Sequence, residues 1–165
     1  MPAWCSQVSD MEKFGATGRI ESYIPHRGGM RLIDRVLEVD DQHVVAEVDV
    51  PFDGLFVRDG RVPAWIGIEY MAQAVSAWAG NRARAKGGAP RAGLLLGSRR
   101  YEVKCDGFPS GKQLRIEVSC ELFAANGLGQ FDCRIVMDGQ AVATARIAVL
   151  DPPEGSTILQ GGATE

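Results

Sequence analysis

Apolar and polar side chains alternate in two runs near the start of the chain, 31–40 (RLIDRVLEVD) and 43–50 (HVVAEVDV). Alternation with a period of two is typical of strands that bury one face. Only Asp41 and Gln42 separate the runs, so we expect an antiparallel hairpin with one face on a core.

A longer and almost continuously apolar segment follows a loop rich in Gly, Asp and Arg. Pro63 opens it and Gly87-Gly88 close it, which are the expected start and stop signals of a helix. Its apolar residues face several directions, so the predicted helix, 64–86, should be buried rather than lie on a surface. Polar residues interrupt it, so it falls short of the unbroken run of about 20 apolar residues that a bilayer span needs, and the sequence excludes a membrane protein.

The rest of the chain reads as an antiparallel meander. Four strand-like runs occupy 94–104, 112–123, 130–138 and 141–150. Turn residues separate them, and Asp138-Gly139 is a strong hairpin signal. The sequence therefore predicts an α+β fold, in which an antiparallel sheet wraps around one long central helix. We expect a single domain, 20–150, between an N-terminal extension, 1–19, and a flexible C-terminal tail, 151–165.

Composition and charge narrow the function classes. The 18 Lys and Arg residues against 21 Asp and Glu residues give a net charge of -3, which argues against a nucleic-acid binder with a broad basic surface. The N-terminus has neither a basic leader nor an apolar core segment, so we expect a cytoplasmic protein. The four cysteines form no C-x-x-C pair, so they are expected to be small buried hydrophobes and no metal is expected.

Glu69 is the most informative polar residue, because a carboxylate in an apolar helix is costly to desolvate unless it is paired or protonated. Gln73 and Ser76 lie on the same helical face and extend it into a narrow polar stripe. The stripe either carries chemistry or faces solvent or an interface water.

Three other features are weaker signals. His26 lies in a loop whose Pro and Gly residues could aim its side chain, although it could equally bond a backbone carbonyl or water, whereas His43 reads as a solvated turn residue. The first N–H groups of the helix, from Ala64 onward, lack a capping side chain and could hold an oxyanion or only water. A cluster of cations after the helix is either a solvated face or a dock for an acidic partner: Arg82, Arg84, Lys86, Arg91, Arg99, Arg100 and Lys104.

Four segments together resemble a known family: IPHRGGMRLIDRVLEVD, PAWIGIEYMAQAV, CDGFPSGKQLRIEV and VMDGQAVATARIAV. In order and spacing they are similar to the β-hydroxyacyl-acyl-carrier-protein dehydratases of type II fatty-acid synthesis, and most of all to the predicted dehydratases of aryl polyene pathways. The resemblance covers residues 20–150. It implies a hotdog fold and a dimer, in which a helix carboxylate of one chain meets a histidine of the other.

The resemblance assigns roles to individual positions. Glu69 matches the catalytic helix carboxylate, and Ala64 matches a helix-start glycine whose amide binds the thioester carbonyl. The usual catalytic histidine lies in a Gly-His-Phe-Pro loop, but the matching position here is Leu55, which cannot act as a base. Either His26 has taken over the role, or the chain is a degenerate subunit that needs a partner. The substrate-binding residues expected beside the catalytic pair are Ala64, Trp65, Leu55, Phe56 and Gln73.

The reaction that this resemblance implies is removal of water from a 3-hydroxyacyl thioester carried on the phosphopantetheine arm of an acyl carrier protein. Neutral His26 would take the proton beside the carbonyl, protonated Glu69 would give one to the leaving hydroxyl, and the Ala64 amide would hold the thioester oxygen. No cofactor is needed. Hydrolysis of an acyl thioester by the helix carboxylate, and a non-catalytic subunit of a hotdog heterodimer, remain as alternatives.

Overall fold

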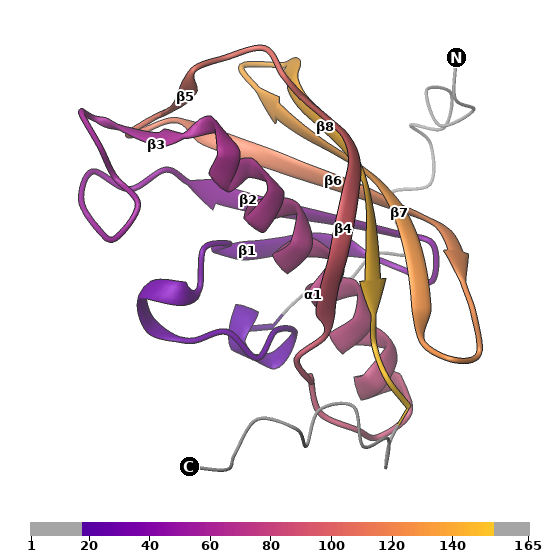
Figure 1. The fold of residues 1–165 in the computed structure, drawn as a ribbon. Helices are drawn as coiled ribbons and strands as arrows, with labels where there is room; N and C mark the ends of the chain where they lie inside the picture. Colours follow the sequence, from indigo (N-terminus) through magenta and orange to yellow (C-terminus); the bar gives the residue numbers. More distant parts are fainter. Residues whose placement is uncertain (1–17, 154–165) are drawn as a thin grey trace, which may run out of the picture.

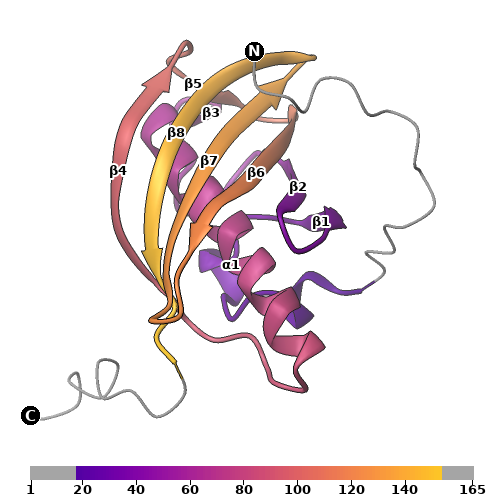
Figure 2. The same cartoon turned by 90° about the vertical axis from the view of Figure 1, so that its right-hand side faces the viewer.

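The computed structural model describes residues 18–153, and its main element is a six-stranded antiparallel sheet in the order β1-β2-β6-β7-β8-β4. The sheet curves around the helix α1, Gly67–Ala85 (Figures 1 and 2). The strands span Arg35–Val39 (β1), His43–Asp49 (β2), Leu94–Val103 (β4), Gln113–Phe123 (β6), Leu128–Met137 (β7) and Gln140–Leu150 (β8). A sheet wrapped around one long central helix is the predicted α+β hotdog architecture, and that prediction is confirmed.

The core lies between the concave face of the sheet and α1. Met71, Ala74 and Trp78 of the helix are at most 1% exposed and face the strands. Inward residues of β6, β7 and β8 alternate with half-buried or exposed ones, as the period-two pattern predicts, and Ile116, Ile135 and Ile147 are 0% exposed. This packing fixes the face that α1 turns away from the sheet, where its polar residues lie.

The Asp138-Gly139 turn joins β7 to β8 as the sequence predicts. Both residues adopt positive φ, 51° and 77°, as a two-residue hairpin turn whose twist matches its strands requires. Asn126-Gly127 forms the turn between β6 and β7, and there the Asn126 side chain accepts the Leu128 N–H at 3.1 Å. These turns place β6, β7 and β8 side by side in chain order.

Several boundaries differ from the sequence-based ones. The chain turns once as a 3-10 helix at Ala64–Ile66 before α1 begins, and Trp65, expected to be buried, is 67% exposed on that turn. The first strand starts at Arg35 rather than at residue 31. Two short paired strands, β3 (Arg61–Pro63) and β5 (Gly107–Pro109), were not expected. Each has three residues, too few to show a periodic pattern.

The expected chain ends lie largely outside the described residues. Of the tail 151–165, the described part is Asp151, Pro152 and Pro153; the Asp151 N–H donates to Gly127 and its carboxylate pairs with Arg91 at 3.2 Å. Cys133 is buried, as expected for a core cysteine, while Cys105 and Cys120 are partly exposed and free. Within residues 18–153 no helix has the length and apolarity to cross a bilayer.

Candidate active site

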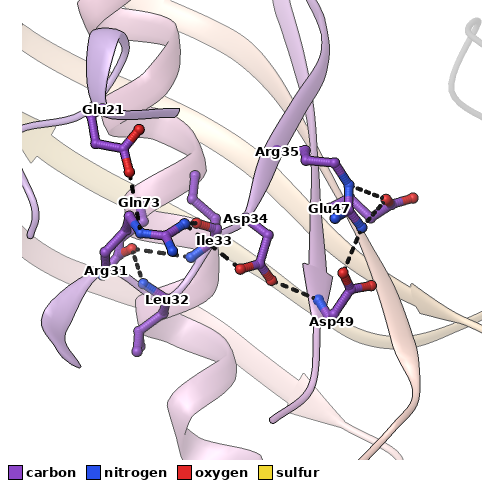
Figure 3. A network of polar contacts seen from close by, with 9 residues as sticks. All are labelled: Glu21, Arg31, Leu32, Ile33, Asp34, Arg35, Glu47, Asp49 and Gln73. Carbon is purple, nitrogen blue, oxygen red and sulfur yellow. Dashed lines mark hydrogen bonds and ion pairs between the residues drawn. The ribbon is translucent and has the colours of Figure 1, made fainter. Parts of the chain in front are cut away.

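The polar stripe of α1, Glu69, Gln73 and Ser76, is hydrogen-bonded through Gln73 to the loop that precedes β1. The Gln73 amide is 0% exposed. Its oxygen accepts the Leu32 and Ile33 N–H groups at 2.8 and 3.4 Å (Figure 3). Its nitrogen donates to the Met30 carbonyl at 2.7 Å. The same nitrogen donates to Glu69 Oε1 at 3.0 Å. The amide therefore joins the loop to the helix and fixes one oxygen of the carboxylate.

These bonds explain two departures from the sequence-based expectations. Residues 32 and 33 satisfy their N–H groups on Gln73, so β1 begins later than the alternating pattern suggests. Gln73 was expected to bind substrate, but it is fully enclosed and its polar atoms all bond within the chain. It is placed to hold other residues rather than to touch a ligand. Ser76 completes the stripe, with its buried hydroxyl lacking a hydrogen-bond partner.

His26 lies beside Glu69 but comes from the loop that precedes β1. The Arg27 guanidinium bonds the carbonyls of Ile24, His26 and Glu21 at 2.6, 2.8 and 3.0 Å and so braces the loop. His26 Nε2 lies 4.0 Å from Glu69 Oε1. Burial lowers the pKa of His26 below its usual 6.5; Glu69 opposes this shift and Arg27 adds to it. The imidazole is therefore largely neutral at pH 7, the form that can accept a proton.

The pair differs from the expected arrangement in two ways. The histidine and the carboxylate were expected to meet across a subunit interface with a gap for substrate between them, but these two lie side by side in one chain. Glu69 also lies in a helix that was expected to be buried, yet its side chain is 36% exposed in the single chain. Substrate would therefore approach the pair from one side.

The helix start lies one turn before Glu69. Among the turn, loop and cap hydrogen bonds of residues 18–153, none uses the N–H of Ala64 or Trp65. The Ala64 carbonyl accepts two bonds, from the Gly67 N–H and from the Tyr101 hydroxyl. Tyr101 comes from the distant strand β4, and sequence reasoning missed it because it sits among exposed residues with no motif around it.

The other expected substrate-binding residues gather beside this site. Leu55 and Phe56 line a cavity of about 200 Å³ together with Tyr70 and Val62. The Phe56 ring meets the Trp65 ring edge-on, with centroids 6.5 Å apart. Leu55 is 59% exposed. Gly29, Arg31 and Leu32, from the loop that precedes β1, also line the cavity, while His26 and Glu69 do not.

Other polar features of the described residues lie away from His26 and Glu69. Within residues 18–153 no group of three or more His, Cys, Asp and Glu side chains could hold a metal ion. His43 is a solvated residue, 54% exposed and 3.5 Å from Asp40, as expected. A larger cavity of about 330 Å³ lies at the far end of α1, lined by Trp78, Arg82, Lys86, Arg91 and Phe123 among others.

Comparison with known proteins gives one consistent result. A family model described as ApeP-like, ApeP dehydratase, matches residues 18–160. The 3-hydroxyacyl-[acyl-carrier-protein] dehydratase FabZ of Dichelobacter nodosus is 30% identical over 149 residues, 83% of this chain and 96% of the relative. The dehydratase heterocomplex ApeI:P from Xenorhabdus doucetiae matches with a TM-score of 0.80 and 30% identity, covering 89% of this chain and 99% of the other. The Escherichia coli PaaI protein, at 15% identity and a TM-score of 0.56, shares the fold.

Proposed function

Because the chain belongs to the ApeP-like dehydratase family, we propose that it removes water from a 3-hydroxyacyl thioester carried on an acyl carrier protein, with His26 as base and Glu69 as acid. The family match supports the reaction class. The observation that carries the residue assignment is the 4.0 Å approach of His26 Nε2 to Glu69 Oε1 on the exposed side of α1.

His26 suits the role of base. Its pKa is lowered mainly by burial, so the imidazole is neutral where the enzyme would operate. The Arg27 bonds to the loop carbonyls hold the backbone on either side of it, and this limits the motion of the ring. A positioned base of this kind contributes typically about 10²- to 10⁴-fold to rate.

Glu69 suits the role of acid through its second oxygen. The Gln73 N–H occupies Oε1, so a proton on this carboxyl belongs on Oε2. That proton would pass to the leaving hydroxyl, while His26 holds the proton taken from the neighbouring carbon. The two reacting substituents sit on adjacent carbon atoms, so an acid and a base that lie side by side can serve both from one face.

The thioester carbonyl would lie at the helix start. The Ala64 and Trp65 N–H groups stand at the positive end of α1 and favour negative charge on an oxygen as the proton leaves. Leu55, Phe56 and Trp65 would contact the acyl chain in and beside the 200 Å³ cavity. The step needs no redox or group-transfer partner.

The free edge of the sheet at β4 supports pairing with a second subunit. Strand β4 pairs only with β8, and nine of its ten residues are exposed, including Leu94, Leu95 and Leu96. A long apolar strand edge is unstable in water, so we expect a second hotdog subunit to pair with it, either another copy or a different chain.

Six of the seven cations after the helix divide into two groups, and the seventh, Lys86, lines the larger cavity at the end of α1. Arg82, Arg84 and Arg91 are engaged within the chain by aromatic rings or by Asp151. Arg99, Arg100 and Lys104 are exposed and make no ion pair within residues 18–153. We expect the acidic carrier protein to dock on these three.

The test is hydration of an enoyl carrier-protein thioester, which is the reverse reaction, by the purified chain and by the chain mixed with a second hotdog subunit. His26→Ala should abolish hydration while fold and assembly persist, and no free thiol should appear. Thiol release unaffected by His26→Ala would establish a hydrolase instead. Absence of turnover in both samples, with tight pairing to the second subunit, would establish a non-catalytic subunit.

A further inference from the structure

Tyr101 is the one residue of β4 that is not exposed. Its hydroxyl reaches across the core side of the sheet to the start of α1, where it donates to the Ala64 carbonyl. Burial raises the pKa of Tyr101 to about 12, so the hydroxyl keeps its proton and remains a donor at any working pH. The strand at the open edge of the sheet therefore supplies one polar contact to the helix start.

A bulge in β4 places the ring there. Arg99 faces Arg146 and Glu102 faces Thr144, so two residues, Arg100 and Tyr101, stand opposite one residue of β8. Arg146 points outward, since its guanidinium binds Asp132 on the exposed face at 2.7 and 3.1 Å. In a regular strand Arg100 would face inward and Tyr101 outward. The extra residue reverses this, at the expense of a positive φ of 57° at Arg100, which arginine adopts rarely.

Gly67, the first residue of α1, leaves room for the contact between the Tyr101 hydroxyl and the Ala64 carbonyl. A Cβ at this position would overlap the Tyr101 hydroxyl and would also crowd Ile135 and Phe108, each 3.1 Å away. The φ of Gly67 is -54°, an ordinary helical value, so the glycine is not required by its backbone conformation. The space it leaves is what admits the hydroxyl.

We propose that the Tyr101 hydroxyl is a positioning group that fixes the Ala64–Trp65 peptide, so that the Trp65 N–H at the helix start faces the thioester oxygen. In a planar trans peptide the N–H points opposite to the C=O, so a bond that holds the Ala64 carbonyl also sets the direction of the Trp65 N–H. The inference rests on the proposed function, because it concerns how that site holds its substrate. Tyr101 itself touches no reacting atom.

A structural consequence follows from the position of β4. The strand that is expected to pair with a second subunit is the strand that orients the helix start. Pairing of β4 with a second subunit would restrict the motion of the bulge at Arg100 and Tyr101, and with it the motion of the helix start. Assembly and substrate binding are then linked through the Tyr101 hydroxyl.

Tyr101→Phe tests the inference, with Tyr23→Phe as the matched control. Tyr23 is 4% exposed and packs under Arg84 at the far end of α1, so its variant removes a hydroxyl without touching the helix start. In the full assembly we expect Tyr101→Phe to lower kcat about 10-fold with KM nearly unchanged. That is less than the roughly 10²- to 10³-fold loss from removing an oxyanion donor itself. Tyr23→Phe should match the wild type.

A spectroscopic readout separates positioning from general damage. The probe is a saturated acyl-phosphopantetheine thioester labelled with ¹³C at the carbonyl, which binds but has no hydroxyl to lose. Hydrogen bonds to the carbonyl lower its stretching frequency, so the bound probe should absorb at lower frequency than the free one in the wild type and in Tyr23→Phe. In Tyr101→Phe the frequency should return toward the free value.

Gly67→Ala should also break the bond between Tyr101 and the Ala64 carbonyl, because its Cβ would displace the Tyr101 hydroxyl. Its loss of kcat should not add to that of Tyr101→Phe in the double variant. Wild-type kcat and carbonyl frequency in Tyr101→Phe would overturn the inference, and so would failure of that variant to fold while Tyr23→Phe folds. If His26→Ala loses hydration while Tyr101→Phe keeps wild-type kcat, the proposed function is supported and the positioning role of Tyr101 is not.

Discussion

The two ends of α1 carry polar residues and a neighbouring cavity, yet they do different things. At the start, Glu69 and Gln73 bond each other and the loop that holds His26. At the end, Arg82 stacks over Trp78 and Phe123, 4.8 and 5.2 Å from the ring centroids, and Arg84 stacks over Tyr23 at 4.7 Å. One end brings proton-transfer groups together, and the other uses cations to cover aromatic rings.

The difference shows that the larger cavity of the described residues does not lie beside the proposed acid and base. The cavity at the end of α1 is the larger, about 330 Å³ against 200 Å³. Its walls carry arginine and lysine, whose charge does not change near neutral pH, and the carboxylate of Asp151 is paired with Arg91. A dehydration needs a proton donor beside a proton acceptor, and of the two ends of α1 only the start places a histidine beside a carboxylate.

The strongest test of this comparison is Glu69→Gln. The substitution keeps the size of the side chain and removes the proton donor, so we expect enoyl hydration to fall by about 10²- to 10⁴-fold. The measurement is steady-state hydration of an enoyl carrier-protein thioester. Glu38→Gln, which removes the same charge from a half-exposed position 3.6 Å from Arg115, is the control and should keep wild-type activity. Full activity in Glu69→Gln would move the reaction centre elsewhere.

Gln73→Leu should have the next largest effect, because it removes four hydrogen bonds from a fully buried site. The N–H of Ile33, a fully buried residue, would lose its partner, and an unpaired buried group of this kind costs about 1–3 kcal/mol. We expect a lower free energy of unfolding in urea and a fall in kcat as the His26 loop loosens. Ser76→Ala removes a buried hydroxyl that has no partner, so it should change neither quantity appreciably.

A smaller effect is expected in the pH dependence. The pKa of His26 is lowered by burial, so the imidazole stays neutral down to pH values below its usual 6.5. The acid limb of kcat/KM in the free enzyme should therefore lie below pH 6.5, and activity should fall as pH decreases through the lowered pKa. His43→Ala should leave this limb in place, since that imidazole is solvated at a turn. An acid limb above pH 6.5 would contradict the assignment of His26 as the base.

Much of the fold could be predicted from the sequence because its signals are local. Alternation and turn residues placed six strands, and the Asp138-Gly139 hairpin formed as expected. The site was only partly predictable. Glu69 stood out as a carboxylate in an apolar helix, but its distance from His26 depends on a loop folded back by Arg27 and Gln73, which no local pattern encodes.

Tyr101 shows what sequence reasoning missed and why. Its inward orientation depends on one extra residue in β4, and a bulge leaves no clear trace in a short alternating run. Gly67 did offer a signal, since glycine inside a helix weakens it and so usually has a packing reason. That signal indicates a close neighbour but not which residue it is, so the contact emerged only from the fold.

The smallest expected effect is at the far end of α1. Arg82→Gln removes the guanidinium that stacks on Trp78 and Phe123, and a cation–π contact at a partly exposed site contributes about 0.5–1 kcal/mol. Arg82→Lys keeps the charge but loses the planar stacking surface, so both variants should unfold at slightly lower urea concentration than the wild type. Neither should alter kcat or KM, because the proposed acid and base lie at the other end of the helix. A loss of activity comparable to that of Glu69→Gln would show that both ends of α1 serve the reaction and would remove the distinction between them.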